Sequence, residues 1–167
     1  MEITGRRIEP PEVSDDYKYR RIYLAFLKSM ETMMPVIVKH EGVEGAKKVY
    51  FAATANFARA LGQKIVKDYK IPPDLEGALR LLEVYNRIFA SEKLYSALDR
   101  DAAYHVIEDC TLWEKMFQPT KTRCDESCTQ SELPHLLKTL GPDFQVEMPE
   151  SRPAGAERCV FKITRKG

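Results

Sequence analysis

Apolar residues in the first half of the chain recur three and four positions apart, the spacing of one face of an α-helix. The first apolar stripe follows Ser14, a residue type that caps helix N-termini, and it is expected to end at Gly42, with a kink or division at Pro35. Its apolar positions are Tyr23, Leu27, Met30, Met34 and Ile37. The pattern predicts a long first helix with an unpaired apolar face, which makes this helix a candidate for homodimer formation.

Two more helices are predicted before the pattern changes. The second stripe lies in residues 42–69 and stops before Pro72, because proline does not continue a helix. Its apolar positions are Val49, Ala53, Phe57, Leu61 and Ile65. The third helix follows Asp74, which is expected to cap it. The apolar positions of this third helix are Leu75, Leu79, Leu82 and Phe89.

Short runs typical of strands begin at Leu94. LYSAL and AYHVI, separated by the turn-like DRD, predict one antiparallel pair, and FQVEM and RCVFKI predict another. Between the pairs, TLWEKMF and ESCTQSELPHLLKTL are predicted to be helical. The expected fold class is therefore α+β, with N-terminal amphipathic helices followed by ββ-αα-ββ. In this fold a four-stranded antiparallel sheet packs against helices.

A length of 167 residues suits one domain. Residues 1–13 are expected to form a flexible N-terminal segment, and residues 14–167 a single α+β domain. Within that domain, residues 14–90 are the helical part, and residues 91–167 are the part that contains the sheet and bears the cysteines.

The charge balance bears on the choice of partners. A formal net charge of +1, from 26 basic and 25 acidic residues, argues against a nucleic-acid partner. The first residues lack the apolar core of a leader peptide, and no run is long enough to cross a bilayer. We therefore expect a cytoplasmic protein with no membrane partner, in which the cysteines are thiols, thiolates or metal ligands rather than disulfides.

All four cysteines lie in residues 110–167, and two of them are four positions apart. If the segment of Cys124 and Cys128 is helical, both sulfurs lie on one face. Together with Cys110 and Cys159 they would then complete a tetrahedral zinc site. The alternative interpretation is that most of these cysteines are small buried apolar residues.

Candidate catalytic residues lie in the same part of the chain. Cys110 is expected at a strand-to-helix junction, where backbone N–H groups would stabilise a thiolate. Glu132 lies four residues after Cys128, on the same helical face, and His135 follows it; a carboxylate and a histidine are the usual acid–base partners of a cysteine nucleophile. The alternative is that Glu132 is a solvated carboxylate and His135 a structural histidine.

Three stretches carry a family resemblance: HVIEDCTLW, CDESCTQSE and LGPDFQVEMPESRPAGAERCVFKI. With the order of helices and strands, they resemble the ATC hydrolase-like family (2-amino-thiazoline-4-carboxylate hydrolase) and the related 4-vinyl reductase domain family, over most of the chain after Gly42. By position, Cys110, Cys128 with Glu132, and Cys159 match the family's cysteines and acidic residue, whereas Cys124 is extra.

The resemblance implies two classes of function. Hydrolase-like members would open a thiazoline ring, which implies a small-molecule-binding domain with cysteine-dependent hydrolase activity on a small C–N/C–S ring. Cys110 or Cys128 would then be the nucleophile or a ligand contact, with Glu132 and a histidine in acid–base roles. Members of the 4-vinyl reductase type imply a non-enzymatic sensor or adaptor that binds zinc or a ligand, although the cysteine expected where PESRPAG stands is absent. The arrangement also resembles the TRAPP trafficking subunits, which are interaction proteins.

Overall fold

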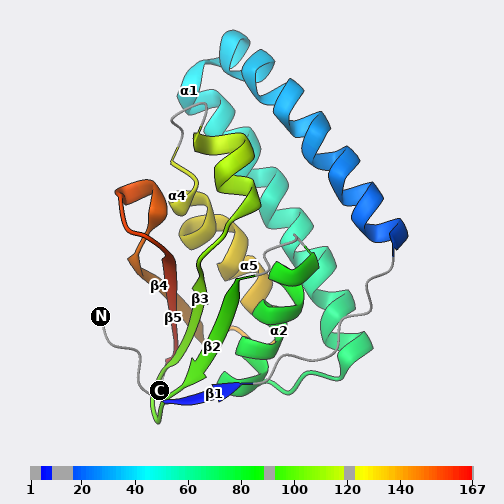
Figure 1. Cartoon of the computed structure of the whole chain (residues 1–167). Coiled ribbons are helices and arrows are strands. Elements are labelled where there is room, and N and C mark those ends of the chain that lie inside the picture. Colours follow the sequence, from blue (N-terminus) through cyan, green and yellow to red (C-terminus); the bar gives the residue numbers. More distant parts are fainter. Residues whose placement is uncertain (1–4, 9–16, 89–92, 119–122, 167) are drawn as a thin grey trace.

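The computed structural model describes residues 5–8, 17–88, 93–118 and 123–166, and in them a five-stranded antiparallel sheet packs against helices (Figure 1). The strand order across the sheet is β1-β2-β3-β5-β4. The strands are β1 (Arg6–Ile8), β2 (Leu94–Leu98), β3 (Ala103–Ile107), β4 (Phe144–Glu150) and β5 (Cys159–Arg165). The predicted α+β class and its four-stranded antiparallel sheet are confirmed, and β1 adds a short fifth strand at one edge.

The sheet register brings distant residues of the chain together. Ser96 on β2 pairs with His105 on β3, and His105 in turn pairs with Phe161 on β5. At the other end of β3, Ile107 pairs with Cys159, which places Cys159 close in the sheet to the segment that leads to Cys110. The sheet register therefore helps to position residues of both polar clusters described below.

The N-terminal segment that the sequence predicts to be flexible contains β1. Residues Arg6–Ile8 pair with Ser96–Leu98, and the Arg6 guanidinium donates to Glu76 at 2.7 Å. The predicted helix cap at Ser14 lies outside the described residues.

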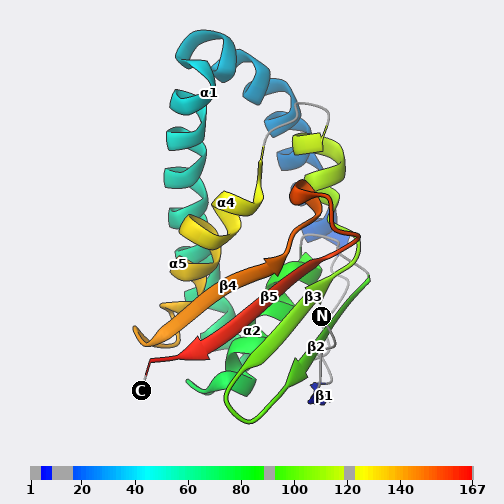
Figure 2. The same ribbon diagram turned by 90° about the vertical axis from the view of Figure 1, so that its left-hand side faces the viewer.

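The longest element, α1 (Tyr17–Tyr69), is two helices joined at Gly42. Gly42 has φ 70° and ψ 175°, a left-handed φ that glycine adopts without steric cost. The helix continues through Pro35, so the break lies at Gly42 and not at the proline. We call residues 17–41 the arm and residues 43–69 the return helix. The arm and the return helix diverge from Gly42 like the sides of a V (Figures 1 and 2).

The return helix buries a different face from the one that its apolar row predicts. Val49 and Phe57 are exposed, while Ile65, further along the same row, is buried. A row of residues four apart drifts about 40° around a helix of 3.6 residues per turn at every step, so it leaves the buried face within a few turns. The residues that face the protein interior instead include Ala46, Tyr50 and Ala58.

Helix α2 (Leu75–Ile88) lies between α1 and the sheet. As predicted, Asp74 caps it: the Asp74 carboxylate accepts the backbone N–H of Gly77 at 2.7 Å. The sequence indicates one apolar face, but this helix is covered on several sides. Its buried residues are Gly77, Ala78, Leu79, Leu81, Leu82, Glu83, Val84 and Tyr85.

Two helical segments follow the first strand pair. The first contains the π-helical turn η1 (Trp113–Phe117). The second is continuous through α4 (Asp125–Ser127), the π-helical turn η2 (Cys128–Glu132) and α5 (Leu133–Leu137). A 3-10 turn, η3 (Arg152–Ala154), links β4 to β5. π-Helical turns are rare and occur often at functional sites, so η1 and η2 indicate that the region between α1 and the sheet is a candidate functional site.

None of the helices in the described ranges is long and apolar enough to cross a membrane.

Candidate functional site

Polar side chains of the return helix hold the segment α4–η2–α5 in place. The Thr54 hydroxyl lies 3.3 Å from the hydroxyls of Ser127 and Ser131, and Ser131 donates to the Phe51 carbonyl at 2.5 Å. Lys47 adds an ion pair with Glu126. Because Ser127 and Ser131 face α1, the residues that follow each of them, Cys128 and Glu132, lie about 100° further around the helix. This rotation turns Cys128 and Glu132 towards the interior.

Asp125 ties the same segment to the connection between β4 and β5. Its carboxylate accepts from the Arg123 guanidinium at 2.8 Å and from the Ser151 hydroxyl at 2.8 Å. The hydrogen bond from Arg123 lowers the pKa of Asp125, and the one from Ser151 lowers it further. The start of α4 is thus fixed from two directions.

Glu132 is a buried carboxyl group with one clear partner. The Tyr85 hydroxyl on α2 donates to Glu132 Oε1 at 2.7 Å, and both residues are buried. Burial raises the pKa of Glu132, and the hydrogen bond from Tyr85 offsets only part of that rise. Glu132 is therefore more readily protonated than an exposed glutamate, and can hold a proton for transfer.

Two of the four cysteines, Cys110 and Cys128, interact electrostatically with this carboxyl group. Cys124 and Cys128 are joined by the helical hydrogen bond from Cys128 N–H to the Cys124 carbonyl at 3.1 Å, as their spacing predicts. Cys110 precedes η1, and Cys159 begins β5. Cys124 and Cys159 are buried, Cys110 and Cys128 are half-buried, and all four are free thiols. We call Cys110, Cys128, Glu132 and Tyr85 the thiol–carboxyl cluster.

Burial disfavours the thiolate form of all four cysteines. The N–H of Trp113 points at Cys110 Sγ at 3.4 Å, so the predicted backbone contact at the strand-to-helix junction is present. Burial nevertheless dominates and raises the pKa of Cys110 to about 12. It likewise raises the pKa values of Cys124, Cys128 and Cys159, and the negative charge of Glu132 adds to the rise at Cys128. The effect of the Trp113 N–H on the pKa of Cys110 is therefore smaller than the effect of burial.

The predicted zinc site finds no support in the structure. Within the described ranges, no three or more His, Cys, Asp or Glu side chains come together in a way that could hold a metal ion. The sulfurs of Cys110, Cys124, Cys128 and Cys159 influence one another's pKa values without forming a ligand set. A metal site needs its ligands around one ion, and these four cysteines come from three separate parts of the fold: the segment before η1, the segment that leads through α4 into η2, and the start of β5.

The structure does not bring His135 to a cysteine in any contact that it describes. His135 Nδ1 lies 2.7 Å from the carbonyl of Ser131, one turn earlier in the same helix, which fits a donated N–H. This hydrogen bond is a local contact of the helix, and it matches the structural alternative for His135.

A second buried polar cluster, which the sequence pattern did not predict, lies between α2 and strands β2 and β3. Ser96 donates to Glu83 Oε1 at 2.6 Å and lies 2.9 Å from His105 Nδ1. Asn86 Nδ2 lies 3.0 Å from His105 Nε2. Because the one hydroxyl hydrogen of Ser96 points to Glu83, Nδ1 of His105 carries the hydrogen and Nε2 accepts from Asn86. Burial lowers the pKa of His105 to about 3, so its imidazole is neutral.

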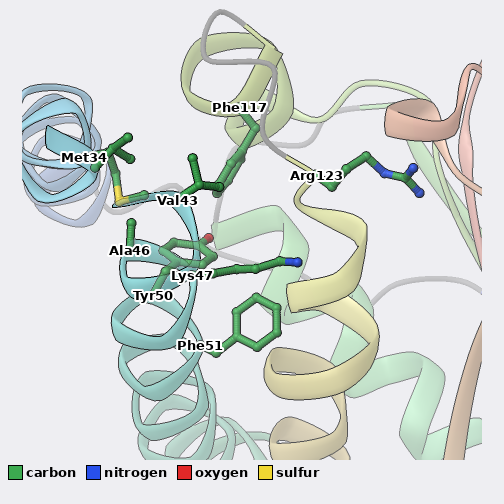
Figure 3. Close-up of a pocket in the computed structure, with 9 residues that line it drawn as sticks. Met34, Val43, Ala46, Lys47, Tyr50, Phe51, Phe117 and Arg123 are labelled. Atoms are coloured by element: carbon green, nitrogen blue, oxygen red, sulfur yellow. The ribbon is translucent and has the colours of Figure 1, made fainter. Parts of the chain in front are cut away.

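A small pocket opens at the hinge of α1 (Figure 3). Met34 of the arm, Ala46 and Tyr50 of the return helix, and Phe117 of η1 line it, and Tyr50 meets Phe117 edge-on at 5.1 Å. Its volume is about 20 Å³, enough for roughly one water molecule. Tyr50 lines this pocket and also interacts with the thiol–carboxyl cluster, since burial and then the charge of Glu132 raise its pKa.

Two cations also border the pocket, and both are already paired. Lys47 reaches across towards α4 and pairs with Glu126, while the Arg123 guanidinium points away from the pocket and pairs with Asp125 (Figure 3). The space between the labelled side chains is therefore largely apolar.

No protein-family model and no curated protein matches the sequence. The resemblance to the ATC hydrolase-like and 4-vinyl reductase families accordingly stays a prediction from the quoted motifs.

The raised thiol pKa values predict slow chemical labelling of the folded protein. At pH 8 a rise in the pKa of Cys110 from 9.0 to about 12 lowers its thiolate fraction roughly a thousandfold. We expect iodoacetamide to modify Cys110 at least ~100-fold more slowly in the native protein than in 6 M guanidinium, as followed by peptide mass spectrometry. Labelling of native Cys110 at the rate of the denatured chain would contradict this description of the cluster.

Proposed function

We propose that this chain is a small-molecule-binding domain with hydrolase activity on a small ring that contains C–N and C–S bonds, and that Glu132 is its proton-transfer group. The observation that carries the proposal is the buried Glu132 carboxyl, held by Tyr85 at 2.7 Å on a π-helical turn. A carboxyl group whose pKa is raised by burial is a common source of general acid catalysis near neutral pH. The resemblance to the ATC hydrolase-like family supports the choice of substrate class.

The chemistry assigned to the cluster uses water as the nucleophile. Water adds its oxygen to the ring carbon between nitrogen and sulfur, the C–S bond breaks, and the sulfur departs with the bonding pair. Glu132 gives its proton to that sulfur and recovers a proton from the attacking water. The thiols of Cys110 and Cys128 are poorly suited to the nucleophilic role because burial raises the pKa of each.

Access to the cluster would come through the pocket at the hinge of α1. The pocket is too small for a ring compound in this conformation, but Met34 and Val38 in its wall belong to the arm. The arm joins the return helix at Gly42, whose backbone is the one non-helical point inside α1. A change of angle at Gly42 would move this wall and enlarge the pocket while the cluster stays fixed by α2 and the sheet.

Glu132→Gln tests the proposal directly. The amide keeps the shape of the side chain and removes its acid–base function, so we expect turnover of 2-amino-thiazoline-4-carboxylate, followed by chromatography of the ring-opened product, to fall at least ~100-fold. Cys110→Ser and Cys128→Ser, made separately, should retain most of the turnover. Glu147→Gln, at an exposed position of β4, is the control for loss of a carboxylate. Equal activity of Glu132→Gln and Glu147→Gln would rule out the assigned role.

A second candidate function is non-enzymatic binding of a small molecule, as the resemblance to the 4-vinyl reductase type implies. It is favoured by the small, largely apolar pocket at the hinge of α1, whose two cations, Lys47 and Arg123, are already paired with Glu126 and Asp125. Native mass spectrometry of the purified chain distinguishes the two functions. A retained ligand together with no turnover of the thiazoline by the wild-type chain would favour binding alone.

A further inference from the structure

Tyr50 is a buried polar side chain to which the proposed function assigns no role. It lies on the return helix, is only 8% exposed, and lines the pocket at the hinge of α1. Its hydroxyl oxygen points away from the return helix, into the space between the labelled side chains (Figure 3). Among the residues that the structure describes, none forms a hydrogen bond with this hydroxyl. Buried tyrosine hydroxyls usually have a partner, so this donor is available to a molecule that enters the pocket.

A contact between two facing helices places Tyr50 near Glu132. The Ser131 hydroxyl donates to the Phe51 carbonyl at 2.5 Å, and one turn further along the return helix Thr54 lies 3.3 Å from Ser131. Tyr50 directly precedes Phe51, and Glu132 directly follows Ser131. The charge of Glu132 also acts on Tyr50, where it adds to the rise in pKa that burial causes. The wall of the pocket and the proposed proton-transfer group therefore meet at Tyr50.

Tyr50 keeps this place when the arm moves. The same two hydrogen-bonded contacts tie the return helix to η2, whereas Met34 and Val38 belong to the arm, on the other side of Gly42. The edge-on contact with Phe117 at 5.1 Å holds the ring of Tyr50 from η1. A change of angle at Gly42 would thus enlarge the pocket on the side of the arm, and a ring compound that enters would meet the Tyr50 hydroxyl.

We propose that Tyr50 is a second catalytic residue of the hydrolase: its hydroxyl donates a hydrogen bond to the ring nitrogen of the bound substrate. As the water oxygen adds to the carbon between nitrogen and sulfur, the electron pair of the C=N bond moves onto this nitrogen, and the hydrogen bond stabilises the charge that develops there. The C–S bond then breaks, Glu132 protonates the sulfur and takes one proton back from the water, and the second proton of the water ends on the ring nitrogen. This inference rests on the proposed function.

The ionisation of the two buried tyrosines fits this division of roles. Burial raises the pKa of Tyr50 well above that of an exposed tyrosine, so its hydroxyl keeps its hydrogen near neutral pH and acts as a donor, not as a base. Tyr85 is also buried and protonated, but its one hydroxyl hydrogen is directed to Glu132. Tyr85 therefore positions the proton-transfer group, and Tyr50 contacts the substrate.

Tyr50→Phe removes the hydroxyl and keeps the ring that packs on Phe117. We expect kcat for 2-amino-thiazoline-4-carboxylate to fall about 100-fold and KM to change by less than about threefold, because the hydrogen bond strengthens in the transition state. Tyr104→Phe is the matched control for loss of a tyrosine hydroxyl. Tyr104 precedes His105 on β3, so it lies on the face of the sheet opposite α2, and its variant should keep the wild-type kcat. Urea denaturation checks that both variants fold.

The pH profile of turnover separates a substrate contact from support of Glu132. Turnover by a general acid falls as the pH rises through its pKa. Tyr50→Phe is expected to lower the whole profile and leave the position of this limb unchanged. Tyr85→Phe, which removes the hydrogen bond that lowers the pKa of Glu132, should move the limb to higher pH.

Three results would overturn the role of Tyr50, and they are distinguishable. If the wild type is active and Glu132→Gln is impaired, but Tyr50→Phe turns over like Tyr104→Phe, the hydrolase function stands and Tyr50 has no part in it. A limb that moves in Tyr50→Phe as it does in Tyr85→Phe would show that Tyr50 acts through Glu132 and not on the substrate. No turnover by the wild type would remove the hydrolase function and the role of Tyr50 together.

Discussion

Lowering the pH from 7 to 4 is expected to reduce the free energy of unfolding by about 3 kcal/mol through His105 alone. In the unfolded chain this histidine titrates near its ordinary pKa of 6.5, whereas burial lowers its pKa to about 3 in the folded protein. Between these two values the unfolded state binds a proton that the folded state does not, so stability falls as the pH falls. A domain of ordinary stability would lose a large part of its free energy of unfolding.

Urea titrations at pH 7 and pH 4, on the wild type and on His105→Gln, measure this contribution. The amide does not titrate, so we expect the loss of stability between the two pH values to be smaller in the variant by about 3 kcal/mol. Asp125, Glu76 and Glu150, whose pKa values are lowered by their Arg partners, destabilise both proteins at low pH and cancel in the comparison. The raised pKa of Glu132 acts in the opposite direction and cancels in the same way. Equal losses in the two proteins would show that His105 does not titrate across this interval.

Much of the fold follows from local signals. β2 and β3 coincide with the predicted runs LYSAL and AYHVI, because alternation and the intervening turn depend only on neighbours in sequence. The start of α2 at Asp74 and the break at Gly42 are equally local, since a cap or a left-handed backbone needs one suitable residue. The break predicted at Pro35 is wrong because a helix can tolerate a proline at the cost of one hydrogen bond, and Gly42 provides the easier place to turn.

The candidate site was only partly predictable. The i,i+4 relation of Cys128 and Glu132 predicted their shared face, and both are turned to the interior as neighbours on η2. Tyr85 was missed because its role depends on the packing of α2 against η2, which spacing does not reveal. At Cys110 burial raises the pKa, whereas the local N–H contact lowers it. The sequence predicted the contact, but burial depends on tertiary packing, and burial decides the direction of the shift.

The sequence contains a signal for the second polar cluster. Glu83 and Asn86 lie four residues after Leu79 and Leu82, on the apolar face of this helix, and polar residues in such a place need buried partners. The partners Ser96 and His105 lie opposite each other on β2 and β3, so the strand register brings them together. Polar residues at predicted core positions are therefore a signal for the members of this cluster, though not for their hydrogen bonds.

Both polar clusters depend on α2, because this helix supplies Tyr85 to one and Glu83 with Asn86 to the other. The position of α2 is set at its first turn, where Gly77 packs against the chain that precedes the helix. A β-carbon at residue 77 would lie 1.8 Å from the Pro72 carbonyl oxygen and 3.1 Å from Ile71 Cγ2. The first of these is a backbone atom, so the whole turn must move to admit even a methyl group.

Gly77→Ala is therefore expected to lower the free energy of unfolding by at least ~3 kcal/mol, measured by urea denaturation at pH 7. Helix propensity alone predicts the opposite sign, a gain of about 0.5–1 kcal/mol for alanine over glycine inside a helix. Gly141→Ala is the control, since its β-carbon would meet only Phe144, at an ordinary 3.9 Å. Its stability should stay within about 0.5 kcal/mol of the wild type. A stabilised Gly77→Ala would mean that α2 is free to shift at its first turn, and that the Tyr85–Glu132 hydrogen bond is not held by the packing described here.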